Sequence, residues 1–494
     1  MDNLTLEGMT LRRVTGRLIP FLFLMYVVSI IDRTNVSFAA LQMNRDLGFS
    51  AAMYGLGAGI FFLGYALFEV PSNLVLARVG ARRWIARIAI TWGLLASAMM
   101  LVRSAGSFYI LRFLLGVAEA GFFPGIIYYL SHWFPERYRA RAISRFMLGV
   151  PVAMVVSGPL SGAILALDGT LGVAGWQWLF LLEGVPAMIL GAVALRYLTD
   201  RPDDARWLPP DEREWLRAQL EREQRGIAGV ERRVARAMTA PALWCLAVPY
   251  IAVGTALYAA MFWAPTVVRE SLGLEPMGVG LVIGAVGVVS AVAMVWLGAS
   301  SDHRRERVGH ASLAMVVSAS GFTTAALRPE PVLAVVGLAA AIAGSCAFLP
   351  VFWCLPTRFL RGTAAAGGIG LLNAVGSLGG FVGPNILGFV KDATGSFSGG
   401  LAAISVMAFS GAVVMWMLRR VSVFSQELHF DGSPGNTVSS VDRWPGRISD
   451  RYATADDHGL SHDPARLRGG NVGYRGYPLS GAEDAGGVGS RGGR

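Results

Sequence analysis

The sequence predicts an all-α membrane protein with twelve transmembrane helices, arranged as two bundles of six. Only 15% of the 494 residues are charged and 54% are hydrophobic, whereas soluble domains carry about 25% charged residues. Apolar runs of about 18–25 residues recur along the chain, and this length spans the hydrocarbon core of a bilayer as a helix. Because backbone polar groups in lipid must be satisfied within their own segment, each run is expected to be helical.

The positions of these runs predict the twelve helices in order. We expect them at 18–38, 53–76, 84–102, 108–131, 142–166, 176–198, 243–268, 278–299, 309–327, 331–356, 364–389 and 398–419. Several contain proline, which membrane helices tolerate as a kink. The first run holds Asp32 and Arg33 and lacks a small-residue cleavage site, so we expect a retained helix and not a signal peptide.

Composition changes along the chain predict four regions. They are an N-terminal six-helix bundle (1–198), a cytoplasmic central loop (199–241), a C-terminal six-helix bundle (242–421) and a disordered cytoplasmic tail (422–494). The charged middle of the loop, 211–224, is expected to form a surface helix. The tail is rich in Gly, Arg, Asp and Ser, a composition that does not bury a core. A basic turn after the second helix (78–83) has a counterpart after the eighth (301–307), which indicates an internally repeated transporter.

The distribution of charge and cysteine excludes several other classes. Arginines concentrate in alternate loops, which predicts a multi-pass protein with both termini in the cytoplasm. The net charge of +10 lies in loops and tail and not on a soluble face interleaved with aromatics, so we expect no nucleic-acid partner. Three scattered cysteines without a CxxC pattern, and no HExxH or clustered Cys/His set, predict neither a metal site, a cofactor nor an enzyme.

Ionisable residues inside the predicted helices are the first candidates for function, because a charge at the bilayer centre costs at least about 2.5–3.5 kcal/mol. Asp32 and Arg33 lie in the first helix, and Arg112 and Glu119 lie seven residues apart on one face of the fourth. That spacing is too long for a direct bond, so each needs a partner elsewhere, and the first helix supplies both signs. We expect an Asp32–Arg112 contact from their similar depth. The alternative is an ion-pair network that only locks the two helices together.

Such a set can link proton binding to anion binding. Arginine stays charged and grips carboxylates through two parallel hydrogen bonds. If a substrate carboxylate takes over an arginine, the protein carboxylate loses its partner and tends to bind a proton. The hypothesis is that Arg33 holds the substrate carboxylate, while Glu119 and Asp32 carry protons.

Other polar residues inside the helices have two interpretations each. Glu69, and Glu183 likewise, can bind protons or serve as a gate or cap partner. Tyr65, four residues before Glu69 on the same face, can bond a substrate hydroxyl or only pack. Asn373 can face the substrate or bridge helices, and Trp353 is a substrate contact or a packing residue.

Specific motifs surround these residues, at 32–37 (DRTNVS), 64–73, 112–125 and 379–384. Together they resemble the anion:cation symporter branch of the major facilitator superfamily, over about residues 15–420. The resemblance implies proton sites at Asp32 and Glu119, working arginines at Arg33 and Arg112, and substrate-cavity positions at Tyr65, Trp353 and Asn373.

Gating or structural roles are expected for Glu69 and for residues of the two basic turns, namely Arg78, Arg82, Asp302 and Arg305. The first turn departs from the superfamily pattern because 73–78 lacks the usual aspartate, whereas the second copy keeps it as Asp302.

The resemblance also implies an activity. Bacterial members of this branch take up organic anions, usually with protons, so the resemblance implies a bacterial inner-membrane symporter that imports a sugar acid, hydroxy-dicarboxylate or aromatic carboxylate by alternating access. It is expected to need no cofactor, to lie in the lipid bilayer and to act as a monomer. A facilitator, exchanger or sodium-coupled carrier of the same anions stays open, as does a receptor or scaffold.

Overall fold

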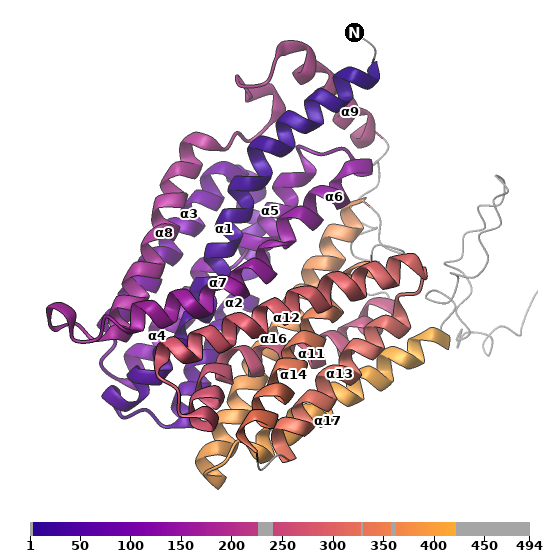
Figure 1. The fold of residues 1–494 in the computed structure, drawn as a ribbon. Helices are drawn as coiled ribbons and strands as arrows, with labels where there is room; N and C mark the ends of the chain where they lie inside the picture. Colours follow the sequence, from indigo (N-terminus) through magenta and orange to yellow (C-terminus); the bar gives the residue numbers. More distant parts are fainter. Residues whose placement is uncertain (1–2, 226–240, 328–329, 357–361, 421–494) are drawn as a thin grey trace, which may run out of the picture. The chain divides into compact units, whose positions relative to one another are not determined.

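The structure, a computed structural model, describes residues 3–225, 241–327, 330–356 and 362–420. The expected tail at 422–494 and part of the central loop lie outside these residues. All regular elements in the described part are helices (Figure 1).

The first half begins with a helix much longer than its apolar run. Its helices are α1 (Asn3–Leu47), α2 (Ala51–Val79), α3 (Ala81–Ala98), α4 (Ala105–Glu119), α5 (Phe122–Ser131), α6 (Glu136–Met147), α7 (Gly149–Leu165) and α8 (Gly175–Tyr197). The start of α1 extends beyond the run because it has polar partners outside the apolar layer, where Arg13 pairs with Glu212 at 2.5 Å and Tyr138 donates to Glu7. Hydropathy marks only the part of a helix that lies within the apolar layer.

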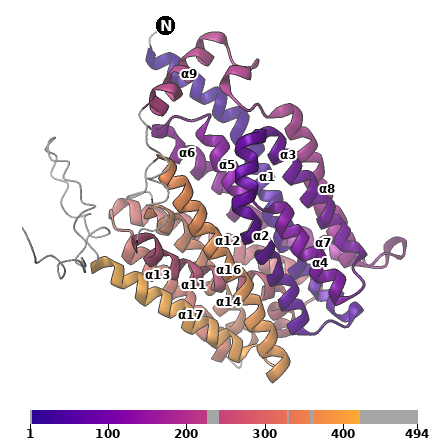
Figure 2. The ribbon, with the colours of Figure 1, turned by 180° about the vertical axis from the view of Figure 1, so that it is seen from behind.

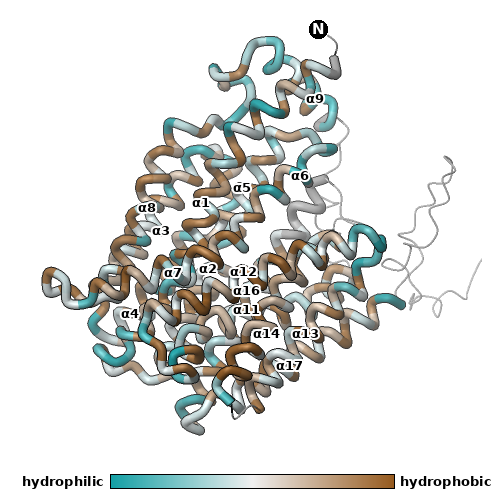
Figure 3. The backbone as a smooth tube through the Cα atoms, in the orientation of Figure 1, coloured by the Kyte–Doolittle hydropathy of each residue, from teal (hydrophilic) through white to brown (hydrophobic). Residues whose placement is uncertain are grey.

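The second half starts after a charged helix. α9 (Pro210–Arg225) coincides with the predicted surface helix at 211–224, and Figure 3 shows it as largely hydrophilic. It is followed by α11 (Pro241–Leu272), α12 (Pro276–His303), α13 (Val308–Leu327), α14 (Pro331–Trp353), α16 (Gly362–Thr394) and α17 (Ser398–Met417).

Eleven helical segments in the described residues are long and apolar enough to cross a membrane. α16 falls between the tenth and the eleventh of them and has 33 residues, enough at 1.5 Å per residue to span the bilayer. It packs along α2 and α11 (Figure 2). With α16, the described residues contain twelve helical segments long enough to span a bilayer, as many as the sequence predicts.

The predicted fourth and fifth helices are each divided in two. The fourth is α4 followed by α5, because Ala120 leaves the helical conformation and Gly121 takes a left-handed one with φ 84°. A Cβ at Gly121 would lie 2.4 Å from Ser72 Oγ, so the tight passage against α2 also requires glycine. Glu119 is therefore the last residue of α4 and not a mid-helix position.

The two halves meet along α2–α16 and α7–α12. At the α7–α12 crossing, a Cβ on Gly158 would lie 2.3 Å from the carbonyl oxygen of Gly280, a backbone approach that only glycine allows. At the end of α16, Asp392 accepts hydrogen bonds of 2.9 Å from the N–H groups of Ala51 and Ala52 and so caps the N-terminus of α2. These contacts join the two halves at the arginine-poor end of the helices.

Candidate functional site

Arg33 and Glu119 form a buried ion pair between α1 and α4. Arg33 Nη2 donates to Glu119 Oε1, and the Glu119 side chain is 1% exposed. Arg33 is 12% exposed, and its Cζ lies 5.1 Å from the ring centre of Tyr65. Its Nη1 lies 3.5 Å from the hydroxyl of Tyr258 on α11. The guanidinium therefore sits between the two halves, with one edge held by Glu119 and another directed at the second half.

Asp32 faces away from this pair into the first half. Its Oδ2 accepts a 2.6 Å hydrogen bond from Trp92 Nε1 on α3, while its Oδ1 has no hydrogen-bond partner among the described residues. The prediction that Asp32 contacts Arg112 is wrong. Consecutive helical residues point about 100° apart, so Arg33 can face α4 only if Asp32 turns toward α3.

Arg112 is fully buried and bonds to backbone instead. Its Nε donates to the carbonyl of Gly57 at 3.2 Å and its Nη2 to that of Ala58 at 3.1 Å, both on α2. Its Cζ lies 5.0 Å from the ring centre of Phe61. In this conformation Arg112 fastens α4 to α2, and two of its nitrogens are not available to an anion.

Glu69 on α2 and Asn373 on α16 join the two halves. Asn373 Nδ2 donates to Glu69 Oε1 at 2.7 Å, and Glu69 is 1% exposed. Tyr65, one helical turn before Glu69, is 3% exposed and stacks on Phe61. Asn373 thus does bridge helices in this conformation, and the bridge lies beside the Arg33 site.

Aromatic residues of the second half complete the surroundings of Arg33. Tyr250 stacks on Phe352 at 4.7 Å and meets the edge of Trp353 at 5.1 Å, so Trp353 belongs to an aromatic cluster on α11 and α14. Tyr258 packs against Phe62 at 4.3 Å. Sequence reasoning singled out neither Tyr250 nor Tyr258, although two tyrosines inside an otherwise apolar run were an available signal.

Glu183 forms a separate contact inside the first half. Its Oε1 accepts a 2.8 Å hydrogen bond from Ser161 on α7, and its Oε2 has no hydrogen-bond partner among the described residues. No arginine pairs with it in the part of the chain that the structure describes.

The basic turn after α2 is fixed by an aspartate from elsewhere. Asp200 accepts from the backbone N–H of Arg82 at 2.8 Å and lies 3.8 Å from its guanidinium. Arg78 is exposed. Asp200 therefore occupies the role of acidic partner that the motif at 73–78 lacks.

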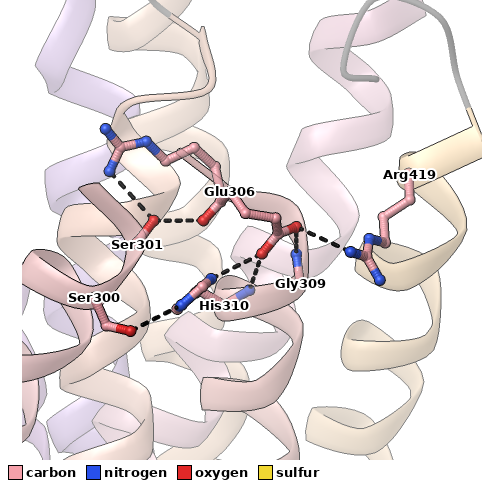
Figure 4. A network of polar contacts seen from close by, with 7 residues as sticks. Ser300, Ser301, Glu306, Gly309, His310 and Arg419 are labelled. Atoms are coloured by element: carbon pink, nitrogen blue, oxygen red, sulfur yellow. Dashed lines mark hydrogen bonds and ion pairs between the residues drawn. The ribbon is translucent and has the colours of Figure 1, made fainter. Parts of the chain in front are cut away.

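In the turn after α12, the ion pair does not form between residues that are adjacent in the sequence. Asp302 pairs with Arg307, whereas Arg305 is exposed and has a positive φ of 51°. Arg307 also donates to Ser301 Oγ at 3.2 Å, and Ser301 in turn bonds to the carbonyl of Glu306 (Figure 4).

Glu306 is the centre of a polar network in this turn, outside the membrane-spanning segments. It accepts from the N–H groups of Gly309 at 2.5 Å and His310 at 3.0 Å, and it lies 2.8 Å from His310 Nδ1 and 3.5 Å from Arg419 (Figure 4). Partial burial alone would raise the pKa of Glu306, but these donors outweigh it and hold the pKa below the usual range. The ionised carboxylate caps α13 and ties it to the end of α17.

The fold and the site around Arg33 and Glu119 together define a secondary transporter, because two helical repeats enclose a charged site at their interface. Among the described residues, no group of three or more His, Cys, Asp or Glu side chains is arranged to hold a metal ion.

The model of the Major Facilitator Superfamily matches residues 22–384, and the chain belongs to this family. The family consists of transporters and not of enzymes, as the sequence predicted.

Bacterial relatives align over most of the chain. A protein of Agrobacterium vitis named "Putative tartrate transporter" is 46% identical over 84% of this chain and 93% of its own length. The "Quinolone resistance transporter" of Acinetobacter baumannii is 39% identical over 83% of this chain and 95% of its own. The inner membrane transport protein RhmT of Escherichia coli K12 is 39% identical over 82% and 94%.

Solved structures confirm the fold. A bacterial homologue of the human lysosomal transporter Spinster, in an inward-facing conformation, superposes with a TM-score of 0.69, covering 84% of this chain and 98% of its own at 19% identity. The xylose transporter XylE from E. coli, in a partially occluded inward-open conformation, gives 0.65 at 12% identity, covering 82% and 98%.

Proposed function

We propose that this protein imports an organic anion together with protons by alternating access, and that Arg33 is the anion-binding group. The observation that carries the proposal is the ion pair of Arg33 with Glu119 at the interface of the two halves. Arg33 is the partly exposed cation of the site, and its present partner is a carboxylate that a substrate carboxylate can replace.

The coupling follows from competition for Arg33. When the anion takes the guanidinium, Glu119 is left buried without a cation, and an isolated carboxylate in that environment is strongly disfavoured. Glu119 then binds a proton. Asp32, with one oxygen unpartnered and Trp92 on the other, is proposed as a second proton carrier. Arg112 acts through the α2–α4 contact.

Hydroxy-dicarboxylates are the substrates that we favour within the anion class. A relative at 46% identity bears a name that refers to tartrate. The Tyr65 and Tyr258 hydroxyls and the Asn373 amide near Arg33 supply partners for substrate hydroxyls, and Trp353 lies in the adjoining aromatic cluster.

From the arginine-rich loops we infer that both termini, the central loop (199–241) and the tail (422–494) lie in the cytoplasm. The end at which α2–α16 and α7–α12 join the two halves then faces outward, and the site opens inward when Glu69 and Asn373 separate. Residues 1–198 and 242–421 are the two bodies that rock about the site, and the protein is proposed to act as a monomer in the bacterial inner membrane.

Export is the second candidate, because a relative at 39% identity is named for quinolone resistance. A facilitator, an exchanger or a sodium-coupled carrier would transport the same anions and would differ in how transport is coupled.

The test uses protein reconstituted in liposomes that contain a pH-sensitive dye. Tartrate, other hydroxy-dicarboxylates, sugar acids, aromatic carboxylates and a quinolone are added in turn, with sodium and without. We expect acidification of the lumen with one anion class, and none in Glu119→Gln. Isotope uptake without acidification in the wild type would refute proton coupling. Sodium dependence would favour the sodium-driven alternative.

A further inference from the structure

Glu69 is a buried carboxyl with half of its hydrogen-bonding capacity unused. Asn373 occupies Oε1 from the opposite half at 2.7 Å, whereas Oε2 has no hydrogen-bond partner among the described residues. The Asn73 side chain bonds to the backbone carbonyl of Glu69 and not to its carboxyl group. A carboxylate that is 1% exposed is costly unless it has a cation or several donors.

The groups that face Glu69 come from four elements. Arg33 of α1, Tyr65 of its own helix and Tyr250 of α11 lie within electrostatic range, and Asn373 of α16 bonds to it. Arg33 is the cation of this set, and it is already paired with Glu119 of α4. Arg112 of α4 is directed at the backbone of Gly57 and Ala58.

Glu69 is also close to where an anion on Arg33 would lie. It follows Tyr65 by one helical turn, about 5.4 Å along the same face of α2, and the Tyr65 ring centre is 5.1 Å from Arg33 Cζ. A small anion held by Arg33 that extends along Tyr65 is therefore directed toward the Glu69–Asn373 pair. Its far end competes with Glu69 for the Asn373 amide.

The chemistry of that far end decides what Glu69 has to do. A sugar acid presents a hydroxyl group, and an ionised carboxylate can accept a hydrogen bond from it without charge repulsion. A dicarboxylate presents a second negative charge, and two carboxylates that share a buried site cannot both stay ionised without a cation between them. A neutral Glu69 removes the repulsion and donates its own hydrogen to the substrate.

We propose that Glu69 is a third protonatable group of the transport site, which must be neutral for a dianion to bind. A dicarboxylate is therefore carried with one proton more than a monocarboxylate of the same length. This inference rests on the proposed function of proton-coupled anion uptake. The additional proton is taken up by Glu69 from the outer side and released to the inner side when Glu69 and Asn373 separate, and their bond forms again when the empty carrier closes.

The experiment compares tartrate with threonate, a four-carbon sugar acid in which a hydroxymethyl group replaces one carboxylate. Liposomes carry the purified protein, the membrane potential is clamped at zero with potassium and valinomycin, and the anion ratio at which net flux stops is measured at several pH gradients. Each proton carried changes that ratio about tenfold per unit of pH difference. We expect the tartrate slope to exceed the threonate slope by one decade per unit.

The variant Glu69→Gln keeps an acceptor for Asn373 but cannot exchange a proton. We expect its tartrate slope to fall by one decade per unit while its threonate slope is unchanged. Glu183→Gln is the matched control, since Glu183 is an equally buried glutamate that bonds within the first half, and it should leave the difference between the two anions intact. If only tartrate is carried, the fall of the tartrate slope in Glu69→Gln is sufficient to test the inference.

Three outcomes would overturn the inference. They are equal slopes for the two anions in the wild type, an unchanged tartrate slope in Glu69→Gln, and exclusion of tartrate while threonate is carried. Each of these leaves proton-coupled uptake itself intact. A wild-type slope of zero for every anion instead refutes the proposed function. If Glu69→Gln is not recovered folded, the wild-type comparison stands by itself.

Discussion

Replacing Glu119 by glutamine should strengthen anion binding while it abolishes accumulation. Glutamine has nearly the shape of glutamate, and its carbonyl oxygen can still accept from Arg33. What it removes is the negative charge that competes with the substrate for the guanidinium. The variant therefore separates the affinity of the site from its coupling.

The magnitude follows from the contact that the anion has to displace. A hydrogen bond to a charged group contributes about 1.5–3 kcal/mol, against about 0.5–1.5 kcal/mol for a neutral pair. The Arg33–Glu119 pair has a single ion-pair contact and a 1% exposed carboxylate, so water screens it little. The anion should thus gain about 1–1.5 kcal/mol in Glu119→Gln, which lowers Kd about tenfold.

Calorimetric titration of the detergent-solubilised protein at pH 8 measures the effect on the anion that the liposome panel identifies. Wild-type affinity should rise as the pH falls and Glu119 takes its proton, and this rise should be smaller in Glu119→Gln, in which only Asp32 and Glu69 still titrate. Glu183→Gln serves as the control and should keep wild-type Kd at each pH, because no arginine pairs with Glu183 in the described part of the chain. A thermal melt verifies that each variant is folded.

Two results would refute this reasoning. If the folded Glu119→Gln binds the anion more weakly than the wild type at pH 8, Glu119 contributes to binding instead of competing for Arg33. If it still accumulates the anion against a gradient as the wild type does, the proton is carried elsewhere.

Three further predictions concern stability and its pH dependence. Gly116→Ala should lower Tm by overpacking of about 1–3 kcal/mol, because its Cβ would lie 2.0 Å from the carbonyl oxygen of Phe61, whereas Gly106→Ala on the same helix has 4.0 Å of clearance and should not; equal Tm values would contradict the packing. Arg112→Lys keeps the charge but loses one of the two hydrogen bonds to α2, so the protein should lose about 1.5–3 kcal/mol of stability. The Kd for the anion at pH 8 should change less than threefold. A larger loss of affinity would place Arg112 in the anion site. The depressed pKa of Glu306 means that its stabilising contribution is complete above the ordinary glutamate pKa of about 4.3 and is lost as the pH falls through the lower folded-state pKa. The Tm measured from pH 7 to 3 should therefore fall less steeply in Glu306→Gln than in the wild type. Parallel curves for the two proteins would exclude that contribution.

The sequence by itself determined the class of protein. In lipid, the backbone polar groups of a run of about twenty apolar residues can be hydrogen-bonded only if the run is a spanning helix. The number, order and approximate position of the helices therefore followed from hydropathy. The list of candidate ionisable residues followed from the same rule, because each buried charge in those runs stands out against its surroundings. The motifs at 32–37 and 112–125 then pointed to the family that the comparisons confirm.

Helix ends and breaks were less accessible. α1 begins at Asn3 and not near 18, because its first turns bond to α6 and α9 outside the apolar layer. The break at Gly121 depends on the approach of Ser72 from another helix. Neither contact leaves a signal in the local sequence.

Only the tertiary structure decided which charges pair. A membrane helix is apolar on all sides, so its sequence does not fix which face meets which neighbour. The rotation of α1 directs Arg33 to Glu119 and Asp32 to Trp92, which overturned the expected Asp32–Arg112 contact. The Glu69–Asn373 bond and the tyrosines of α11 join segments about two to three hundred residues apart, and their meeting depends on how the two halves pack.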